Sequence, residues 1–90
     1  MDKREELTTA LVHVERGAAL VQQQKALIAR LSARGLGLDL AHELLARLEL
    51  TLDSLRYHRD LIRREIEEEA QLRSRRRPGD SGGPVQAPGT

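Results

Sequence analysis

The sequence contains no cysteine, tryptophan or phenylalanine, and its one aromatic residue is Tyr57. Without cysteine the chain can form neither a disulfide bond nor a thiolate metal site. Compact globular cores usually fill their volume with aromatic side chains, whereas leucine-rich helical bundles can do without them. No apolar run approaches the roughly 18 residues that a membrane-spanning helix needs. We therefore expect a helical protein with a thin core and no membrane partner.

The sequence also lacks an excess of charge of one sign, because 15 lysines and arginines are balanced by 14 aspartates and glutamates. A net charge of +1 indicates neither a nucleic acid nor a membrane surface as the partner. The opening segment Met1–Glu6 is charged and lacks the apolar stretch of a secretory signal, so we expect a cytoplasmic location. The abundance of arginine, alanine, leucine and glycine suggests a GC-rich bacterial genome.

Leucine, isoleucine and valine recur every seven residues on both sides of a Gly-Leu-Gly break. This spacing predicts an all-α fold, a coiled-coil-like antiparallel two-helix hairpin over residues 1–74. We expect helices of similar length at about 3–34 and about 40–73, joined by a turn at 35–39. The residues expected to form the core are Val14, Val21, Ile28, Leu31, Leu45, Leu48, Leu52, Leu55 and Ile62.

The turn carries the residues that end one helix and start another. Gly35 suits the left-handed conformation after a helix, with Leu36 packing back on Leu31 in a Schellman motif. Gly37 provides a second flexible point. Asp39 is the expected N-cap of the second helix, because its carboxylate can accept hydrogen bonds from the first turn.

Two polar side chains, Gln24 and Arg59, fall at seam positions. They either reach to the edge of a partly hydrated bundle or fix its register, and we favour the edge. Two registers one heptad apart fit the apolar pattern almost equally well. We favour the one that pairs Val21 with Leu55 and Gly17 with Arg59.

A second apolar stripe lies on the second helix, away from the seam, at Leu40, Leu50, Tyr57 and Leu61. A contiguous exposed stripe of this kind is typical of an interface. Because a single helix pair buries each seam residue on one side only, we expect a homodimer that forms a four-helix bundle. A monomeric hairpin and a hairpin docked on another protein are the alternatives.

The chain ends in a proline- and glycine-rich segment, and we expect residues 75–90 to form a disordered tail. The run Arg73–Arg77 precedes it. Arginines near a helix C-terminus interact favourably with the helix dipole, which is the interpretation we favour. Binding of an anion or nucleic acid through this run is an alternative, although no aromatic residues interleave to stack on bases.

The segment His13-Val14-Glu15-Arg16-Gly17-Ala18-Ala19 resembles the core motif of histidine phosphotransfer domains. The resemblance implies that His13 carries the phosphoryl group, that Arg16 assists electrostatically and that Gly17 leaves room for a receiver domain. A histidine phosphotransfer protein is therefore the alternative function. We favour a surface histidine, because the resemblance covers seven residues only.

Two further histidines offer weaker patterns. His42-Glu43 resembles the start of the sensor-kinase H-box. His13 and His58 would lie on one side of the seam, where Glu15 or Glu65 could add oxygen ligands to a metal. We expect solvated histidines, no metal and no cofactor.

The overall layout is similar to a group of small bacterial helical-hairpin proteins. The positions that carry the similarity are His13, Gly17, Gln24, Leu27-Ile28, Gly35, Ala41, Leu44-Leu45 and His58-Arg59-Asp60. The resemblance implies the hairpin and brings no activity with it. The sequence therefore predicts a non-catalytic interaction or regulatory module that acts through self-association, and not an enzyme.

Overall fold

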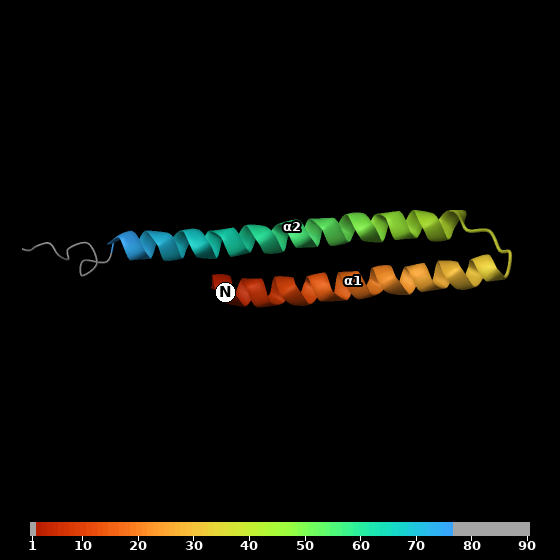
Figure 1. The fold of residues 1–90 in the computed structure, drawn as a ribbon, viewed down its shortest axis with the longest axis horizontal. Helices are drawn as coiled ribbons and strands as arrows, with labels where there is room; N and C mark the ends of the chain where they lie inside the picture. Colours follow the sequence, from red (N-terminus) through yellow and green to blue (C-terminus); the bar gives the residue numbers. More distant parts are fainter. Residues whose placement is uncertain (1, 77–90) are drawn as a thin grey trace, which may run out of the picture.

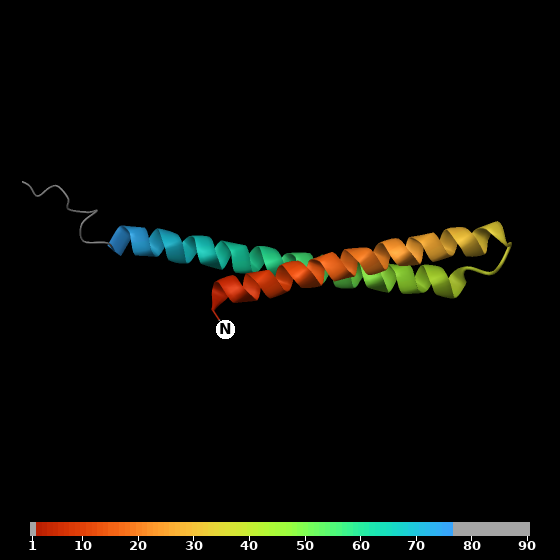
Figure 2. The same cartoon turned by 90° about the horizontal axis from the view of Figure 1, so that it is seen from below.

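The protein is a helical hairpin. The computed structural model describes residues 2–76, which form α1, Lys3–Ala33, and α2, Asp39–Arg76. The helices lie side by side and antiparallel (Figure 1), and a view turned by 90° shows them crossing at a shallow angle (Figure 2). The predicted all-α antiparallel hairpin is confirmed.

The ends of α1 are closed by hydrogen bonds that its sequence supplies. At the start, the Glu5 backbone N–H donates to the Asp2 carboxylate at 2.8 Å. At the other end Gly35 has a φ of 71°, a backbone conformation that costs glycine little. The N–H of Leu36 donates to Leu31 O at 3.1 Å, and the N–H of Gly35 donates to Ser32 O at 3.0 Å. These two bonds form the expected Schellman motif.

The start of α2 differs from our expectation by one residue. The helix begins at Asp39, and the Leu38 carbonyl accepts from the His42 N–H at 2.8 Å. Leu38 therefore occupies the capping position, and the prediction that Asp39 is the N-cap is wrong. Because the backbone is already helical at Asp39, its carboxylate lies within the first turn, where a negative charge still interacts favourably with the helix dipole.

The two helices are unequal in length, contrary to our expectation. α1 has 31 residues and α2 has 38, and α2 continues past the N-terminus of α1 (Figure 1). We call residues 67–76 of α2 the overhang. The helix reaches Arg76, so the prediction that the tail begins at residue 75 is wrong. The remainder of the predicted disordered tail, residues 77–90, lies outside the described residues.

The register is the one that we did not favour. The pairing of Gly17 with Arg59 is wrong, because a Cβ placed on Gly17 would lie 3.2 Å from Leu55 Cδ1 and 3.3 Å from Leu52 Cδ1. Lys3 Nζ also lies 2.9 Å from Glu65 Oε1. Both contacts fit a shift of α2 by one heptad. The physical reason is steric, since the missing side chain of Gly17 leaves the space that two leucines fill.

The core between the helices is only one layer thick. Within the described residues, the apolar side chains that are buried are those of Ala10, Val21, Leu52 and Ile62. The other residues expected in the core are half-buried, and they are Val14, Ile28, Leu31, Leu45, Leu48 and Leu55. A single neighbouring helix covers each seam residue from one side, so the flanks of the seam remain open to solvent.

Candidate functional site

The most exposed large apolar side chains lie on the face of α2 turned away from α1. Leu40 is 80% exposed, Leu50 is 68% exposed and Tyr57 is 65% exposed, and Leu61 in the same stripe is half-buried. We call these four residues the outer stripe. Spacings of seven and four residues keep Leu50, Tyr57 and Leu61 on one face of a helix. Three of the four residues of the stripe predicted from sequence are thus uncovered, and Leu61 is partly covered.

The apolar surface extends to the turn end of the hairpin. Leu36 and Leu44 are exposed there beside Leu40. A shallow hollow of about 300 Å³ lies among Leu40, Leu44 and the ion-paired side chains of Glu43 and Arg47. The sequence pattern did not single out Leu36 or Leu44 as exposed. A heptad count alone cannot identify them, because their exposure depends on how much of the start of α2 is covered by the end of α1.

Gln24 is the one polar residue that is buried within residues 2–75, with 7% of its surface exposed. Its Nε2 donates to the Ala41 carbonyl of α2 at 2.9 Å. The side chain therefore crosses the seam, and the expectation that it reaches to the edge is wrong. Buried amides need such partners, since an unpaired one costs about 1–3 kcal/mol. This contact ties one level of α1 to one level of α2.

Arg59, the other polar seam residue, is half-buried and turns along its own helix. Its Nε lies 2.8 Å from Asp60 Oδ1. The guanidinium of Arg59 holds the pKa of Asp60 below its ordinary value. The Arg59 stem thus covers part of the seam while its charge is satisfied outside it.

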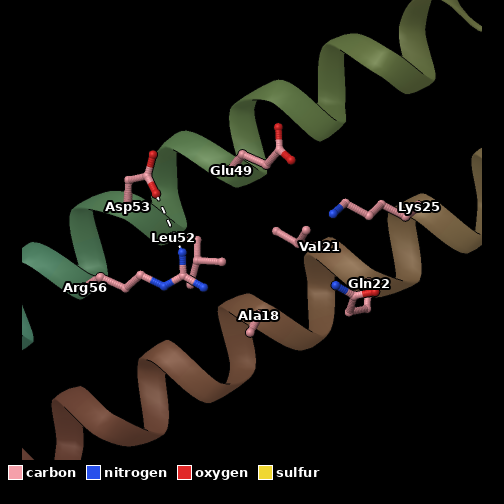
Figure 3. A pocket seen from close by; sticks show the side chains of 8 residues that line it. All are labelled: Ala18, Val21, Gln22, Lys25, Glu49, Leu52, Asp53 and Arg56. Carbon is pink, nitrogen blue, oxygen red and sulfur yellow. Dashed lines mark ion pairs between the residues drawn. The ribbon is translucent and has the colours of Figure 1, made fainter.

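A shallow groove runs along one flank of the seam (Figure 3). Val21 and Leu52 form its floor, and two carboxylates and two cations line its sides. The carboxylates come from Glu49 and Asp53, and the cations come from Lys25 and Arg56. Asp53 and Arg56 form an ion pair of 3.8 Å. Because the charges in the groove balance one another, it offers no excess of either sign to a charged ligand.

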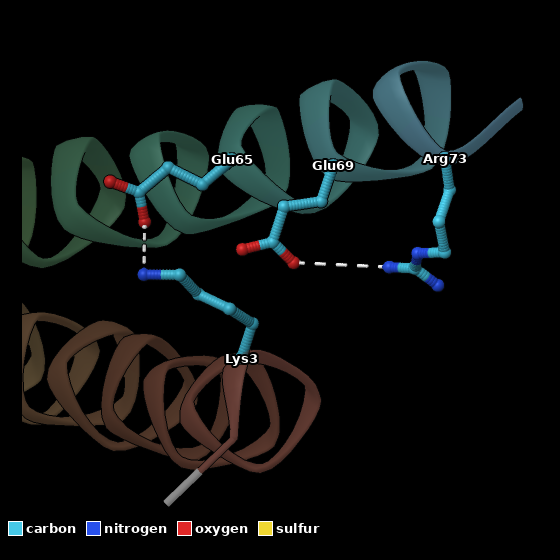
Figure 4. Close-up of polar contacts among 4 residues, drawn as sticks. All are labelled: Lys3, Glu65, Glu69 and Arg73. Carbon is cyan, nitrogen blue, oxygen red and sulfur yellow. Dashed lines mark ion pairs between the residues drawn. The ribbon is translucent and has the colours of Figure 1, made fainter. Parts of the chain in front are cut away.

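One ion pair joins the free end of α1 to α2 (Figure 4). Lys3 Nζ lies 2.9 Å from Glu65 Oε1, and this hydrogen bond raises the pKa of Lys3 above its ordinary value. Arg73 lies 4.0 Å from Glu69 further along, within the overhang. Exposed pairs of this kind contribute little stability, but Lys3–Glu65 marks the level of α2 at which α1 begins.

The histidines and their neighbours lie on the surface. His13 and Arg16 are exposed on α1, as are His42 and His58 on α2. Gly17 lies between the helices, and the space beside it holds Leu52 and Leu55. The structure therefore gives this glycine a packing role in place of the room for a docking domain that the motif implies.

Within residues 2–76, no group of three or more histidine, cysteine, aspartate or glutamate side chains is placed so that it could hold a metal ion. Arg73 and Arg75 of the basic run are exposed on the overhang, while Arg77 lies outside the described residues. Arg73 lines a shallow pocket of about 200 Å³ with Lys3 and Arg4, and the carboxylates of Asp2 and Glu69 offset part of the positive charge there. The exposed apolar side chains are the stronger candidates for binding a partner.

α1 carries an apolar patch of its own. Leu11, Val12, Val14 and Ala18 line a shallow depression of about 540 Å³ with Thr8 and Glu15. Leu11 and Val12 are much less exposed than Leu50 or Tyr57. The outer stripe of α2 is therefore the stronger candidate for a binding surface.

No family model, curated protein or solved structure matches this chain. In the part of the chain that the structure describes, neither helix is long and apolar enough to span a bilayer.

Proposed function

We propose that this protein is a non-catalytic interaction module that acts by self-association through the outer stripe of α2. The observation that carries the proposal is the exposure of Leu40, Leu50 and Tyr57 on one face of a stable helix. Large apolar side chains gathered on one face are typical of a protein interface. On the composition of the sequence, we propose the bacterial cytoplasm as its setting.

The energetics of the hairpin support the same proposal. Burying a leucine side chain fully contributes about 1.5–3 kcal/mol, and the hairpin leaves this contribution unused at Leu40 and Leu50. In a symmetric dimer the same stripe is covered on both copies, so each residue contributes twice. A dimer of two hairpins brings four helices together and compensates for the thin core of each.

Sedimentation equilibrium of the full chain over a wide concentration range tests the proposal. We expect the mass to rise from that of one chain to that of two. Leu50→Glu should keep the protein monomeric, because dimerisation would bury an unpaired carboxylate. Leu20→Glu is the matched control, since Leu20 is an exposed leucine on α1, outside the stripe. It should associate like the wild type.

A wild-type chain with the mass of one copy at every concentration would overturn the proposal. Equal loss of association in Leu50→Glu and Leu20→Glu would place the interface elsewhere. Circular dichroism of both variants checks that the helices remain folded.

A further inference from the structure

One row of residues on the outer face of α2 is complementary in charge to the same row read in reverse. Four positions spaced by seven run Glu43, Leu50, Tyr57, Arg64. The spacing places all four on one side of the helix, and all four are exposed. An acid thus lies seven residues before the apolar centre, and a base lies seven residues after it. Reversing the direction of the helix exchanges the acid with the base.

Resting on the proposed function, we infer that the outer stripe binds α2 of a second copy in antiparallel orientation, with Glu43 of each copy facing Arg64 of the other. In this arrangement Leu50 of one copy packs on Tyr57 of its partner, and the reverse contact follows from the two-fold symmetry. Both ends of the interface then carry an ion pair between copies.

The parallel alternative is disfavoured by charge. It would place Glu43 beside Glu43 of the partner and Arg64 beside Arg64 of the partner. Like charges facing each other across an interface are costly, and charges at a rim fix orientation more than they add affinity. The antiparallel arrangement turns both repulsions into attractions.

The ion pair within the chain leaves Glu43 free for a second cation. Its carboxylate lies 3.2 Å from Arg47, but the Glu43 side chain remains 57% exposed and the Arg47 side chain 74% exposed. A carboxylate can accept about four hydrogen bonds. Glu43 can therefore keep Arg47 and accept a bond from Arg64 of the partner.

The unequal helix lengths fit the same arrangement. With the centre of the interface between Leu50 and Tyr57, the overhang of one copy runs beside the turn of the other. Leu72 is the exposed large apolar residue of the overhang, and it comes level with the turn, where Leu36 and Leu40 are exposed. The antiparallel orientation thus gives these three leucines apolar neighbours.

Cysteine cross-linking tests the orientation directly, because the natural chain has no cysteine. Glu43→Cys and Arg64→Cys variants are prepared separately, mixed and oxidised. In the antiparallel dimer two copies of position 43 lie about 30 Å apart, given a rise of 1.5 Å per residue. A disulfide needs Cα atoms within about 7 Å. We expect a covalent dimer from the mixture and none from either variant alone.

Two further variants separate failure of the orientation from failure of self-association. Ser54→Cys lies next to the two-fold axis, so it should cross-link with itself in either orientation. Glu49→Cys lies on the flank with the charged groove and should not cross-link. A covalent dimer from Glu43→Cys alone would overturn the antiparallel inference and leave the proposed function standing. A wild-type dimer in which Ser54→Cys stays monomeric on oxidation would overturn the inference as well.

Charge reversal gives an independent measurement on the dissociation constant of the dimer. Glu43→Arg and Arg64→Glu should each weaken association, on the order of tenfold, because both ends of the interface then carry like charges. The double variant restores opposite charges and should recover most of the loss. A double variant whose loss of dimer affinity equals the sum of the two single losses would overturn the inference. A wild-type chain that never dimerises would remove the proposed function together with the inference.

Discussion

The two faces of α2 carry the same kinds of side chain and bury them to opposite extents. On the seam face Leu52 is 5% exposed and Ile62 is 2% exposed, whereas Leu50 on the outer face is 68% exposed. Leu50 and Leu52 are two residues apart in the same helix, so neither helix propensity nor composition explains the difference. The difference is whether another helix lies opposite. The hairpin covers one apolar face of α2 and leaves the other exposed.

Two free energies act on the two faces of α2, that of folding the hairpin and that of association, and a single melting curve would mix them. Residues of the seam hold the hairpin together, so their loss should appear at any concentration. In the proposed dimer, residues of the outer stripe hold copies together, so their loss should appear as a change in association.

Leu52→Ala against Leu50→Ala should give the largest contrast. Removing the buried Leu52 side chain leaves a cavity in a one-layer core and should lower the free energy of unfolding by about 2–5 kcal/mol. The same change at the exposed Leu50 should alter it by about 0.5 kcal/mol or less when the protein is monomeric. Urea unfolding followed by circular dichroism at high dilution measures both. Equal losses in the two variants would contradict the division of the faces.

Gly17→Leu tests the close approach of the helices at the seam. The Cβ contacts of 3.2 Å and 3.3 Å to Leu55 and Leu52 leave no room for a branched side chain. We expect a loss of about 1–3 kcal/mol from overpacking. Gly17→Ala should change stability less, because the gain of about 1 kcal/mol in helix propensity offsets the tight contacts. Greater stability of Gly17→Leu would mean that the register is not the one described.

Gly35→Ala tests the turn that brings α2 back alongside α1. Gly35 has a φ of 71°, and a residue with a Cβ loses about 1–2 kcal/mol in that conformation. Gly37→Ala is the control, since no atom lies within 4 Å of its added Cβ and its φ is not positive. Thermal unfolding should separate the two variants. A Gly37→Ala variant that is less stable than Gly35→Ala would contradict the Schellman ending of α1.

Gln24→Leu should change stability little and register more. The variant exchanges one hydrogen bond, worth about 1 kcal/mol net, for apolar contact. With the tie to Ala41 gone, the alternative register one heptad away becomes accessible. Distances between spin labels on exposed positions of α1 and α2 should then show two populations. A single unchanged distance would show that packing at Gly17 alone fixes the register.

The smallest effects should come from pH. The Lys3 pKa is raised by Glu65, so this pair stabilises the fold at neutral pH and its contribution is lost as pH rises through the raised value. The Asp60 pKa is lowered by Arg59, so that contribution is present above the unfolded value and is lost as pH falls. Lys3→Met should flatten the alkaline side of the stability curve, and Asp60→Asn should flatten the acidic side. Melting temperatures across the pH range measure both.

Much of the fold followed from the order of residues. The heptad spacing placed Val21, Leu52 and Ile62 in the seam, and Gly35 with Leu36 indicated how α1 ends. The register did not follow, because two alignments one heptad apart bury nearly the same apolar residues. Their difference lies in the steric fit at Gly17 and in one hydrogen bond from Gln24.

The outer stripe was visible in the sequence because Leu50, Tyr57 and Leu61 recur with helical spacing away from the seam. The end of α2 was predicted near residue 73, close to Arg76, where the helix ends. The overhang was not predicted, because the register that we favoured sets the N-terminus of α1 beside the end of α2. The i,i+4 ion pair of Glu69 with Arg73 accompanies the helix in this segment. The overhang thus became apparent only from the structure.

Tyr57 provides the most direct measurement of the central claim, that the outer stripe is where copies of this chain meet. It is the single aromatic residue, so the intrinsic fluorescence of the protein reports on the stripe alone. Quenching of this emission by acrylamide should be efficient in dilute solution and should fall as the concentration rises and Tyr57 becomes covered. In Leu50→Glu it should stay efficient throughout. Efficient quenching of the wild type at concentrations where sedimentation shows two copies together would contradict the account.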